Sequence, residues 1–222
     1  MARPSPARER ILDAAQRLTM EQGFGSTTVE AVLDRAGASK GAFFHHFPTK
    51  ADLGHALVER YIAADAEMLD GFMRAAEQTG DDPAEQVVDF VRRFEEASDA
   101  IVQEQPSCLL VSFIYEARLI DPRTGALVAE AVVGLRDGIL DKLEKAASDR
   151  PGLAGRDLPA LADQAFTTFE GAFLLARALD DPGAVRRQLA QYRSHLELLL
   201  GLDAPPPAGG GEGDQAAASR MR

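Results

Sequence analysis

Apolar residues recur every three to four positions along nearly the whole chain, the spacing that places them on one face of an α-helix. No run of four to eight residues shows a convincing alternation of apolar and polar residues between turn signals, as a half-buried strand would. With 222 residues, 45% hydrophobic and 27% charged, the chain has the composition of a globular protein with a sizeable core. The pattern predicts an all-α protein of about nine helices.

Two helices are predicted before residue 37. Pro6 stands at the first position of a helix that Gly23 ends. Thr27 and Glu30 have the spacing of a capping box, which predicts the start of a second helix there. Gly37 ends this second helix, because glycine accepts the left-handed conformation that commonly follows a helix.

Two further helix starts follow at once. Ser39 is predicted to cap a third helix that runs to about His46, and Thr49 with Asp52 forms a capping box that opens a long fourth helix reaching roughly Gly80. The second and third helices are short and are joined by a tight turn that contains glycine. This arrangement is typical of a helix-turn-helix, whose second helix lies in the major groove of DNA.

The third helix is predicted to have an inner and an outer face. Phe43 and Phe47 are four residues apart, so they share the face that packs on the other helices. The outer face would approach a groove wall closely, because it carries small and polar side chains together with one ring: Lys40, Gly41, Ala42, Phe44 and His45.

Residues 8–55 contain, in order, the segments RERILDAAQRL, EQGFGSTTVEAV and DRAGASKGAFFHHFPTKADL. They resemble the N-terminal domain of the TetR/AcrR family of transcriptional regulators, and such a long ordered match is far more specific than a lone short motif. The resemblance implies a homodimeric, mostly repressor-type protein, whose three-helix domain binds a palindromic operator and whose helical body senses a small molecule.

The resemblance also implies which residues contact double-stranded DNA. Base and groove contacts fall on Lys40, Gly41, Ala42, Phe44 and His45, and phosphate contacts on Thr27, Thr28, His46 and Lys50, with Ser39 at the start of the same helix. The family commonly has a tyrosine where Phe44 stands, so van der Waals contact must replace a hydroxyl-to-phosphate bond. Thr19 likewise replaces a usual aromatic residue in the first helix.

The charge distribution fits this orientation. The net charge is −11, but residues 1–50 hold 7 Lys and Arg against 5 Asp and Glu, which leaves −13 for residues 51–222. A mildly basic N-terminal domain on an acidic body would face DNA, while the body would suppress indiscriminate binding. The residues suggest three units: a DNA-binding domain over 1–50, a ligand-binding and dimerisation domain over 51–202, and a disordered Pro/Gly-rich tail over 203–222.

The histidines allow a second interpretation. His45, His46 and His55 would be the nitrogen ligands of a metal site, but neighbouring residues on a helix project about 100° apart and no carboxylate completes the set. Surface histidines are the simpler interpretation, so neither a metal nor a cofactor is expected.

Several helices are predicted beyond residue 80. One runs from about Pro83 to Gln105, a shorter and very apolar one covers SCLLVSFIYEARL, and another extends to about Ala147. The last two helices carry apolar residues at alternating steps of three and four, the pattern of a packing seam. The seam residues are Leu158, Ala162, Ala165, Phe169, Ala172, Ala176 and Leu179 in one helix, and Val185, Leu189, Tyr192, Leu196 and Leu199 in the other.

These seams predict a four-helix dimer interface between two chains, although burial in the chain's own core would produce the same pattern. The DNA-binding domain favours the dimer, because two recognition helices about 34 Å apart, or a multiple of one turn, match successive major grooves. A small-molecule pocket is predicted among the remaining apolar and aromatic residues, with an ordinary core as the alternative: Phe90, Phe94, Leu110, Phe113, Ile114, Tyr115, Phe166 and Phe173. Ser112, Arg118, Thr167 and Thr168 are polar neighbours that would orient a ligand.

Other function classes fit less well. The chain offers no Ser-His-Asp order, no phosphate loop and no identifiable carboxylate pair, so an enzyme is not expected, and a helical carrier without DNA binding would not need Lys40 and Lys50. A charged N-terminus and the absence of a long apolar run predict a cytoplasmic protein without a membrane span. Cys108 is interpreted as a small buried hydrophobe rather than a redox sensor.

Overall fold

The computed structural model describes residues 5–104, 108–116 and 121–202. Within these ranges the chain forms nine α-helices and one short 3-10 helix, and no strand. The prediction of an all-α protein is confirmed. The predicted tail over 203–222 and the polar candidate Arg118 lie outside the described residues.

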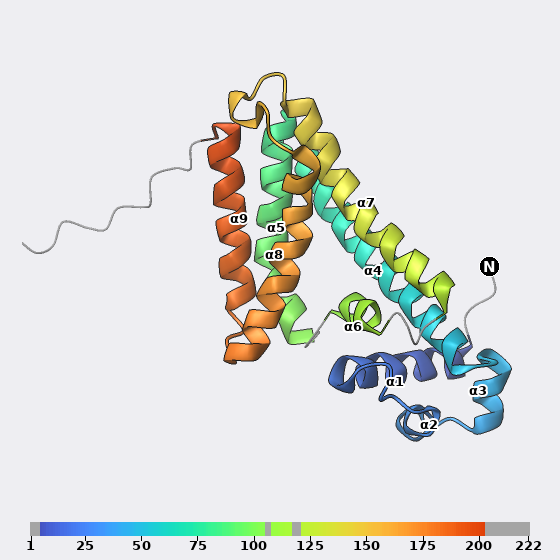
Figure 1. The fold of residues 1–222 in the computed structure, drawn as a ribbon. Helices are drawn as coiled ribbons and strands as arrows, with labels where there is room; N and C mark the ends of the chain where they lie inside the picture. Colours follow the sequence, from blue (N-terminus) through green and yellow to red (C-terminus); the bar gives the residue numbers. More distant parts are fainter. Residues whose placement is uncertain (1–4, 105–107, 117–120, 203–222) are drawn as a thin grey trace, which may run out of the picture.

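The first three helices form a compact unit at one end of the molecule, called the head below (Figure 1). It consists of α1 (Pro6–Gln22), α2 (Val29–Ala36) and α3 (Lys40–His46). Gly23 and Gly37 follow α1 and α2 with positive φ, as the sequence predicted for residues that end a helix. Core residues from all three helices pack together, among them Ile11, Leu12, Val32, Phe43 and Phe47.

The start of α2 differs from the prediction by one residue. Thr28 is the N-cap, and its hydroxyl accepts a hydrogen bond from the backbone N–H of Ala31 at 3.1 Å. Thr27 is buried instead, and its hydroxyl donates to the carbonyl of Gly23 at 2.8 Å. The prediction of a capping box formed by Thr27 and Glu30 is therefore wrong, because the hydroxyl of Thr27 is hydrogen-bonded within the turn before α2.

A single long helix, α4 (Lys50–Glu77), connects the head to the rest of the molecule. It opens with the predicted capping box, in which Thr49 and Asp52 each accept a hydrogen bond from the other's backbone N–H. Its first half contributes Leu53 and Leu57 to the core of the head, and its last turns pack against other helices. No flexible linker separates the two parts.

The remaining helices form the body: α5 (Pro83–Glu104), α6 (Leu109–Tyr115), α7 (Pro122–Ala146), α8 (Leu158–Leu179) and α9 (Ala184–Leu200). Figure 1 shows α5, α8 and α9 as a bundle, with α7 beside α4 and the short α6 lying between the bundle and the head. A 3-10 turn over Pro151–Leu153 lies between α7 and α8. No described helix combines the length and apolarity required to cross a membrane.

The apolar seams of α8 and α9 point into the protomer. Val185, Leu189, Tyr192 and Leu196 of α9 are buried in a single chain, and the hydroxyl of Tyr192 donates to the carbonyl of Leu161 on α8 at 3.1 Å. The α8 seam is likewise buried at Ala162, Ala165, Ala172 and Ala176, while Leu158, Phe169 and Leu199 are half-buried. The predicted seam residues are therefore mostly core residues, because α8 and α9 also pack on α5. Leu179 is the exception, with 67% of its surface exposed.

Candidate nucleic-acid interface and ligand cavity

The helix α3 separates its rings as the sequence predicted. Phe43 and Phe47 are buried with their ring centroids 5.7 Å apart, whereas Phe44 is 46% exposed. Ser39 caps the helix by accepting a hydrogen bond from the N–H of Ala42 at 3.2 Å. The inner rings fix the orientation of α3 on α1 and α2, which leaves its other face toward solvent.

That outer face carries most of the residues expected to contact DNA. Those exposed are Thr28, Ser39, Lys40, Gly41, Phe44 and His45, and those half-buried are Ala42, His46 and Lys50. The ammonium of Lys40 lies 6.0 Å from the centroid of the Phe44 ring, so charge and ring form one surface at the start of the helix. A cation next to a flat apolar group suits contact with both a phosphate and a sugar or base edge.

Two residues expected at phosphates have other contacts. Thr27 is only 1% exposed, so its hydroxyl is not available to a DNA strand. The ammonium of Lys50 donates to the carbonyl of Gly25 at 3.1 Å and lies 4.7 Å from the Phe24 ring centroid. Burial lowers the pKa of Lys50, and the negative charge of Glu116 opposes that shift. Lys50 therefore connects α4 to the turn between α1 and α2. The spacing of residues in the sequence does not reveal this contact.

The histidine pair does not belong to a metal cluster among the described residues. The rings of His45 and His46 lie 4.9 Å apart, and His55 contacts Thr124 at 3.2 Å and Glu59 at 3.6 Å instead.

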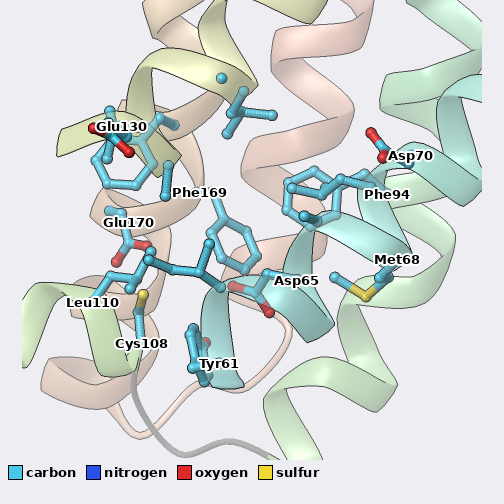
Figure 2. Close-up of a pocket in the computed structure, with 18 of the residues that line it drawn as sticks. Tyr61, Asp65, Met68, Asp70, Phe94, Cys108, Leu110, Glu130, Phe169 and Glu170 are labelled. Atoms are coloured by element: carbon cyan, nitrogen blue, oxygen red, sulfur yellow. The ribbon is translucent and has the colours of Figure 1, made fainter. Parts of the chain in front are cut away.

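A cavity of about 410 Å³ lies between α4, α5, α6, α7 and α8 (Figure 2). Three of the predicted ligand residues line it, namely Phe94, Leu110 and Phe166. A second cavity of about 470 Å³ shares the side chains of Val132 and Phe166 with the first, and Phe113 and Ile114 line it. Both volumes fall within the range of about 300–1,000 Å³ that small-molecule sites occupy.

The other three predicted ligand residues line neither cavity. Phe90 is buried in the core that α5 forms with α7, α8 and α9. Phe173 packs edge-on against Phe169 at 4.8 Å between ring centroids, and Tyr115 is 78% exposed. A ligand held in either of these two cavities would therefore not contact these three residues. Phe169, predicted at a dimer interface, lines the first cavity instead. Of the polar neighbours, neither Ser112, Thr167 nor Thr168 lines either cavity.

The first cavity also contains acidic side chains that were not predicted from the sequence. Asp65 of α4 and Glu170 of α8 both line it, and Figure 2 shows Glu170 beside Cys108 and Leu110. Burial raises the pKa of Asp65 to about 6. Burial also raises the pKa of Glu170 to about 7, with a hydrogen bond to Cys108 acting against the shift and the charge of Asp65 adding to it. The sequence did contain a signal for Asp65, because this acidic residue lies on the same helix face as the apolar residues Tyr61, Ile62 and Leu69.

Cys108 is buried at the N-terminus of α6 and lines the same cavity. Burial raises the pKa of its thiol far above the ordinary value, and the neighbouring Glu170 raises it further. The thiol therefore stays protonated, which agrees with the expectation of a small buried hydrophobe.

The helix α6 links the cavities to the head. Its N-cap Cys108 and its residue Leu110 line the first cavity, while the Phe113 ring lies 4.9 Å from the ring of Phe24 in the head. Glu116, which follows α6, accepts a hydrogen bond from the backbone N–H of Gly25 at 2.5 Å. The segment of α6 and Glu116 is thus in direct contact with the turn between α1 and α2.

Comparison with known proteins shows which family this arrangement resembles. The family described as bacterial regulatory proteins, tetR family, matches residues 11–57, from within α1 to the first turns of α4. Over this segment the chain is similar to the TetR family. Its matched segment contains the two inner rings, the outer face of α3 and the capping box of α4, so the family domain and the candidate nucleic-acid interface coincide.

Named relatives match the same TetR-family segment. The chain is 38% identical over 66 residues to the transcriptional regulator AcuR of Cereibacter sphaeroides, which covers 30% of each protein. It is 37% identical over 67 residues to the transcriptional repressor AcnR of Corynebacterium glutamicum, covering 30% of this chain and 36% of that protein. These matches span about a third of the length of the curated relatives.

Solved structures extend the TetR-family likeness to the whole fold. The regulatory protein TetR from Rhodobacter sphaeroides superposes with a TM-score of 0.71 and 25% identity, covering 86% of this chain and 99% of that one. A TetR-family regulator from Agrobacterium tumefaciens gives the same TM-score with 23% identity over 86% and 98% of the two chains. An N-terminal helix-turn-helix followed by a helical C-terminal part is thus the architecture of this chain.

Proposed function

We propose that this protein is a ligand-responsive transcriptional regulator that binds a palindromic DNA operator as a homodimer and releases it when a small molecule occupies the cavity beside α6. The observation that carries the proposal is the outer face of α3, where Lys40, Phe44 and His45 are exposed above two buried rings. This is the geometry of a recognition helix, in which base-edge contacts specify sequence and basic side chains add affinity for phosphates. The names of the relatives, regulators and a repressor, support the same function and a non-enzymatic role.

The dimer is proposed on a different face from the predicted seams. Leu174 and Leu175 are 58% and 44% exposed on α8, and Leu198 is 80% exposed on the adjacent α9. Gly171 and Ala178 are exposed one turn before and after the α8 leucines, so the backbone of a second chain can approach closely. Single apolar side chains on a surface require no explanation, but leucines with small residues on neighbouring helices suit a two-fold helical interface.

The coupling between cavity and operator is proposed to run through α4 and α6. Tyr61, Asp65 and Leu69 of α4 line the cavity, and the same helix begins at the head. A ligand that prefers one position of α4 and α6 would shift the spacing of the two heads in the dimer. A coupling free energy of about 1–3 kcal/mol, the usual size, changes operator affinity by roughly 5- to 150-fold.

An electrophoretic mobility shift with the DNA that flanks the protein's own gene tests DNA binding. We expect the wild-type chain to shift a fragment of this DNA and Lys40→Ala to weaken the complex about tenfold or more, because a phosphate or base contact is lost. Lys145→Ala is the matched control, since Lys145 is an exposed lysine on α7 whose ion pair with Asp141 lies in the body. Equal loss in both variants, or no shift by the wild type, would reject the proposal.

A further inference from the structure

The first cavity is both apolar and acidic. Four carboxyl groups line it, Asp65 and Asp70 from α4, Glu130 from α7 and Glu170 from α8. Among the described residues that line it there is no lysine, arginine or histidine. Asp70 and Glu130 are exposed, so the cavity has negative charge on its solvent side as well as within. An anionic ligand would meet only like charges here.

The two inner carboxyl groups have no ion-pair partner among the described residues. The salt bridges of the described chain involve neither Asp65 nor Glu170, although α4 and α8 carry Arg60, Arg74 and Arg177. Arg60, the nearest of these in sequence to Asp65, pairs with Glu9 and Asp13 on α1 instead. A carboxylate that is removed from water without a counter-charge is destabilised, and a bound cation would relieve that cost.

The rest of the lining suits the apolar part of such a cation. The rings of Phe94 and Phe169 lie 4.6 Å apart, and Phe166 and Tyr61 complete an aromatic wall. Aromatic faces attract positive groups in addition to burying apolar surface. Figure 2 shows Asp65 and Phe169 facing the same space, with Glu170 on the side of Cys108.

We propose that the cavity takes an organic cation, a protonated amine or ammonium group attached to an aromatic or alkyl body. The positive centre lies near Asp65 and Glu170, and the body lies against Phe94, Phe166 and Phe169. The role of this cation as the effector of a regulator rests on the function proposed above. The binding of the cation to the cavity does not depend on that function.

Three soluble compounds of matched length test the charge preference on the full-length protein. These are 4-phenylbutylamine, which is protonated at pH 7.5 as a lysine side chain is, 4-phenylbutanol and 4-phenylbutyrate. Because the chain has no tryptophan, isothermal titration calorimetry is the suitable measurement. We expect the amine to bind at least tenfold more tightly than the alcohol, and the carboxylate to bind more weakly than either.

Variants then locate the charge. Asp65→Asn combined with Glu170→Gln is expected to weaken the amine at least tenfold and to leave the alcohol within about twofold. Glu144→Gln removes an exposed carboxylate of α7 outside the cavity and is expected to change neither affinity. The wild-type comparison of the three compounds needs no variant, so a double variant that fails to fold does not decide the outcome.

The proposal is overturned if the amine and the carboxylate bind equally, if the carboxylate binds more tightly, if the amine shows no binding at millimolar concentration, or if the folded double variant binds the amine as well as the wild type. The mobility shift described above separates this result from the regulatory function. Binding of the amine without operator binding would refute the regulator and leave the cation site. Operator binding without amine binding would refute the cation site and leave the proposed regulator.

Discussion

The carboxylate of Glu116 accepts a hydrogen bond from the backbone N–H of Gly25, and this contact joins the end of α6 to the turn between α1 and α2. The same carboxylate helps to keep Lys50 charged, and Lys50 donates to the carbonyl of Gly25. The backbone N–H and carbonyl of Gly25 are thus both hydrogen-bonded to side chains outside its turn, those of Glu116 and Lys50. In the coupling proposed above, this turn is the point where a change at the cavity would reach α2 and α3.

Glu116→Ala is expected to free the N–H of Gly25 and to reduce communication between cavity and head. Amide hydrogen exchange at Gly25 should become faster, because its acceptor is lost. The ratio of operator affinities without and with a bound ligand should fall severalfold in a fluorescence anisotropy titration. The neighbouring Tyr115→Ala, at an exposed position, is the control and should alter neither quantity. Unchanged exchange at Gly25 in Glu116→Ala would contradict this prediction.

A substitution at Gly23 tests the position of Glu116 by adding a side-chain atom next to it. Its φ is +83°, and a Cβ placed there would lie 2.6 Å from Oε1 of Glu116. Gly23→Ala should therefore lower the free energy of unfolding by more than about 1 kcal/mol, through backbone strain and the displacement of Glu116. Urea denaturation measures this loss. At Gly25 φ is not positive and an added Cβ would lie 3.5 Å from the same carboxylate, so Gly25→Ala should cost less. Equal losses would remove the steric argument.

The adjacent rings of α3 should separate stability from DNA binding. Phe43→Ala is expected to lower the free energy of unfolding by about 3–5 kcal/mol, because it empties a fully buried site in the head. Phe44→Ala removes an exposed ring, so stability should change by no more than about 0.5 kcal/mol while operator affinity falls about tenfold. Thermal unfolding and anisotropy titrations check the two effects. A large stability loss in Phe44→Ala would mean that its ring belongs to the core.

The two carboxyl groups of the cavity predict a dependence of stability on pH. Their folded-state pKa values, about 6 for Asp65 and about 7 for Glu170, lie above the ordinary values, so the folded chain binds more protons than the unfolded chain between them. Their contribution to stability is complete below about pH 4 and is lost as pH rises through 6 and 7, by roughly 1–3 kcal/mol for each group.

Urea denaturation at pH 5 and pH 8 measures this contribution as a difference between two proteins. The variant with Asp65→Asn and Glu170→Gln should lose less stability than the wild type between the two pH values. Asp70, Glu130, Tyr61 and Cys108 also face the cavity, but they are present in both proteins and cancel in the comparison. Identical pH profiles would show that neither carboxyl group titrates abnormally.

The exposed leucines of α8 and α9 predict the oligomeric state. Leu174→Glu combined with Leu198→Glu should convert a dimer into a monomer in light scattering at micromolar concentration, because two charges would be buried at the interface without partners. Ala126→Glu adds a charge at an exposed position of α7 and should leave the dimer intact. A wild-type chain that is monomeric would refute the proposed dimer itself.

Local signals in the sequence were sufficient to predict where the helices begin and end, but not which other helices they pack against. Gly23, Ser39 and the capping box of Thr49 and Asp52 act within a few residues, so the bounds of α1, α3 and the start of α4 followed from spacing alone. Thr27 and Thr28 compete for one cap, and the tertiary burial of Thr27 decided between them.

The errors at the candidate sites have a common physical origin. An apolar seam such as that of α9 looks the same whether it packs on α5 or on a second chain, so the sequence could not assign Val185 and Leu189 to the core. Phe90 and Phe94 lie four residues apart on α5, yet Phe90 packs in the core with α7, α8 and α9, whereas Phe94 lines the cavity beside Phe169. Asp65 was detectable as a lone charge on an apolar stripe.

The uninterrupted length of α4 sets the scale of the motion that the proposed regulation requires. Its 28 residues span about 42 Å, so a tilt of only about 5° at the body would carry the opposite end sideways by roughly 4 Å. That distance exceeds the length of a hydrogen bond to a base edge. In the regulation proposed above, a rigid lever arm of this kind would allow a ligand to dislodge the protein from its site on the chromosome without unfolding any part of it.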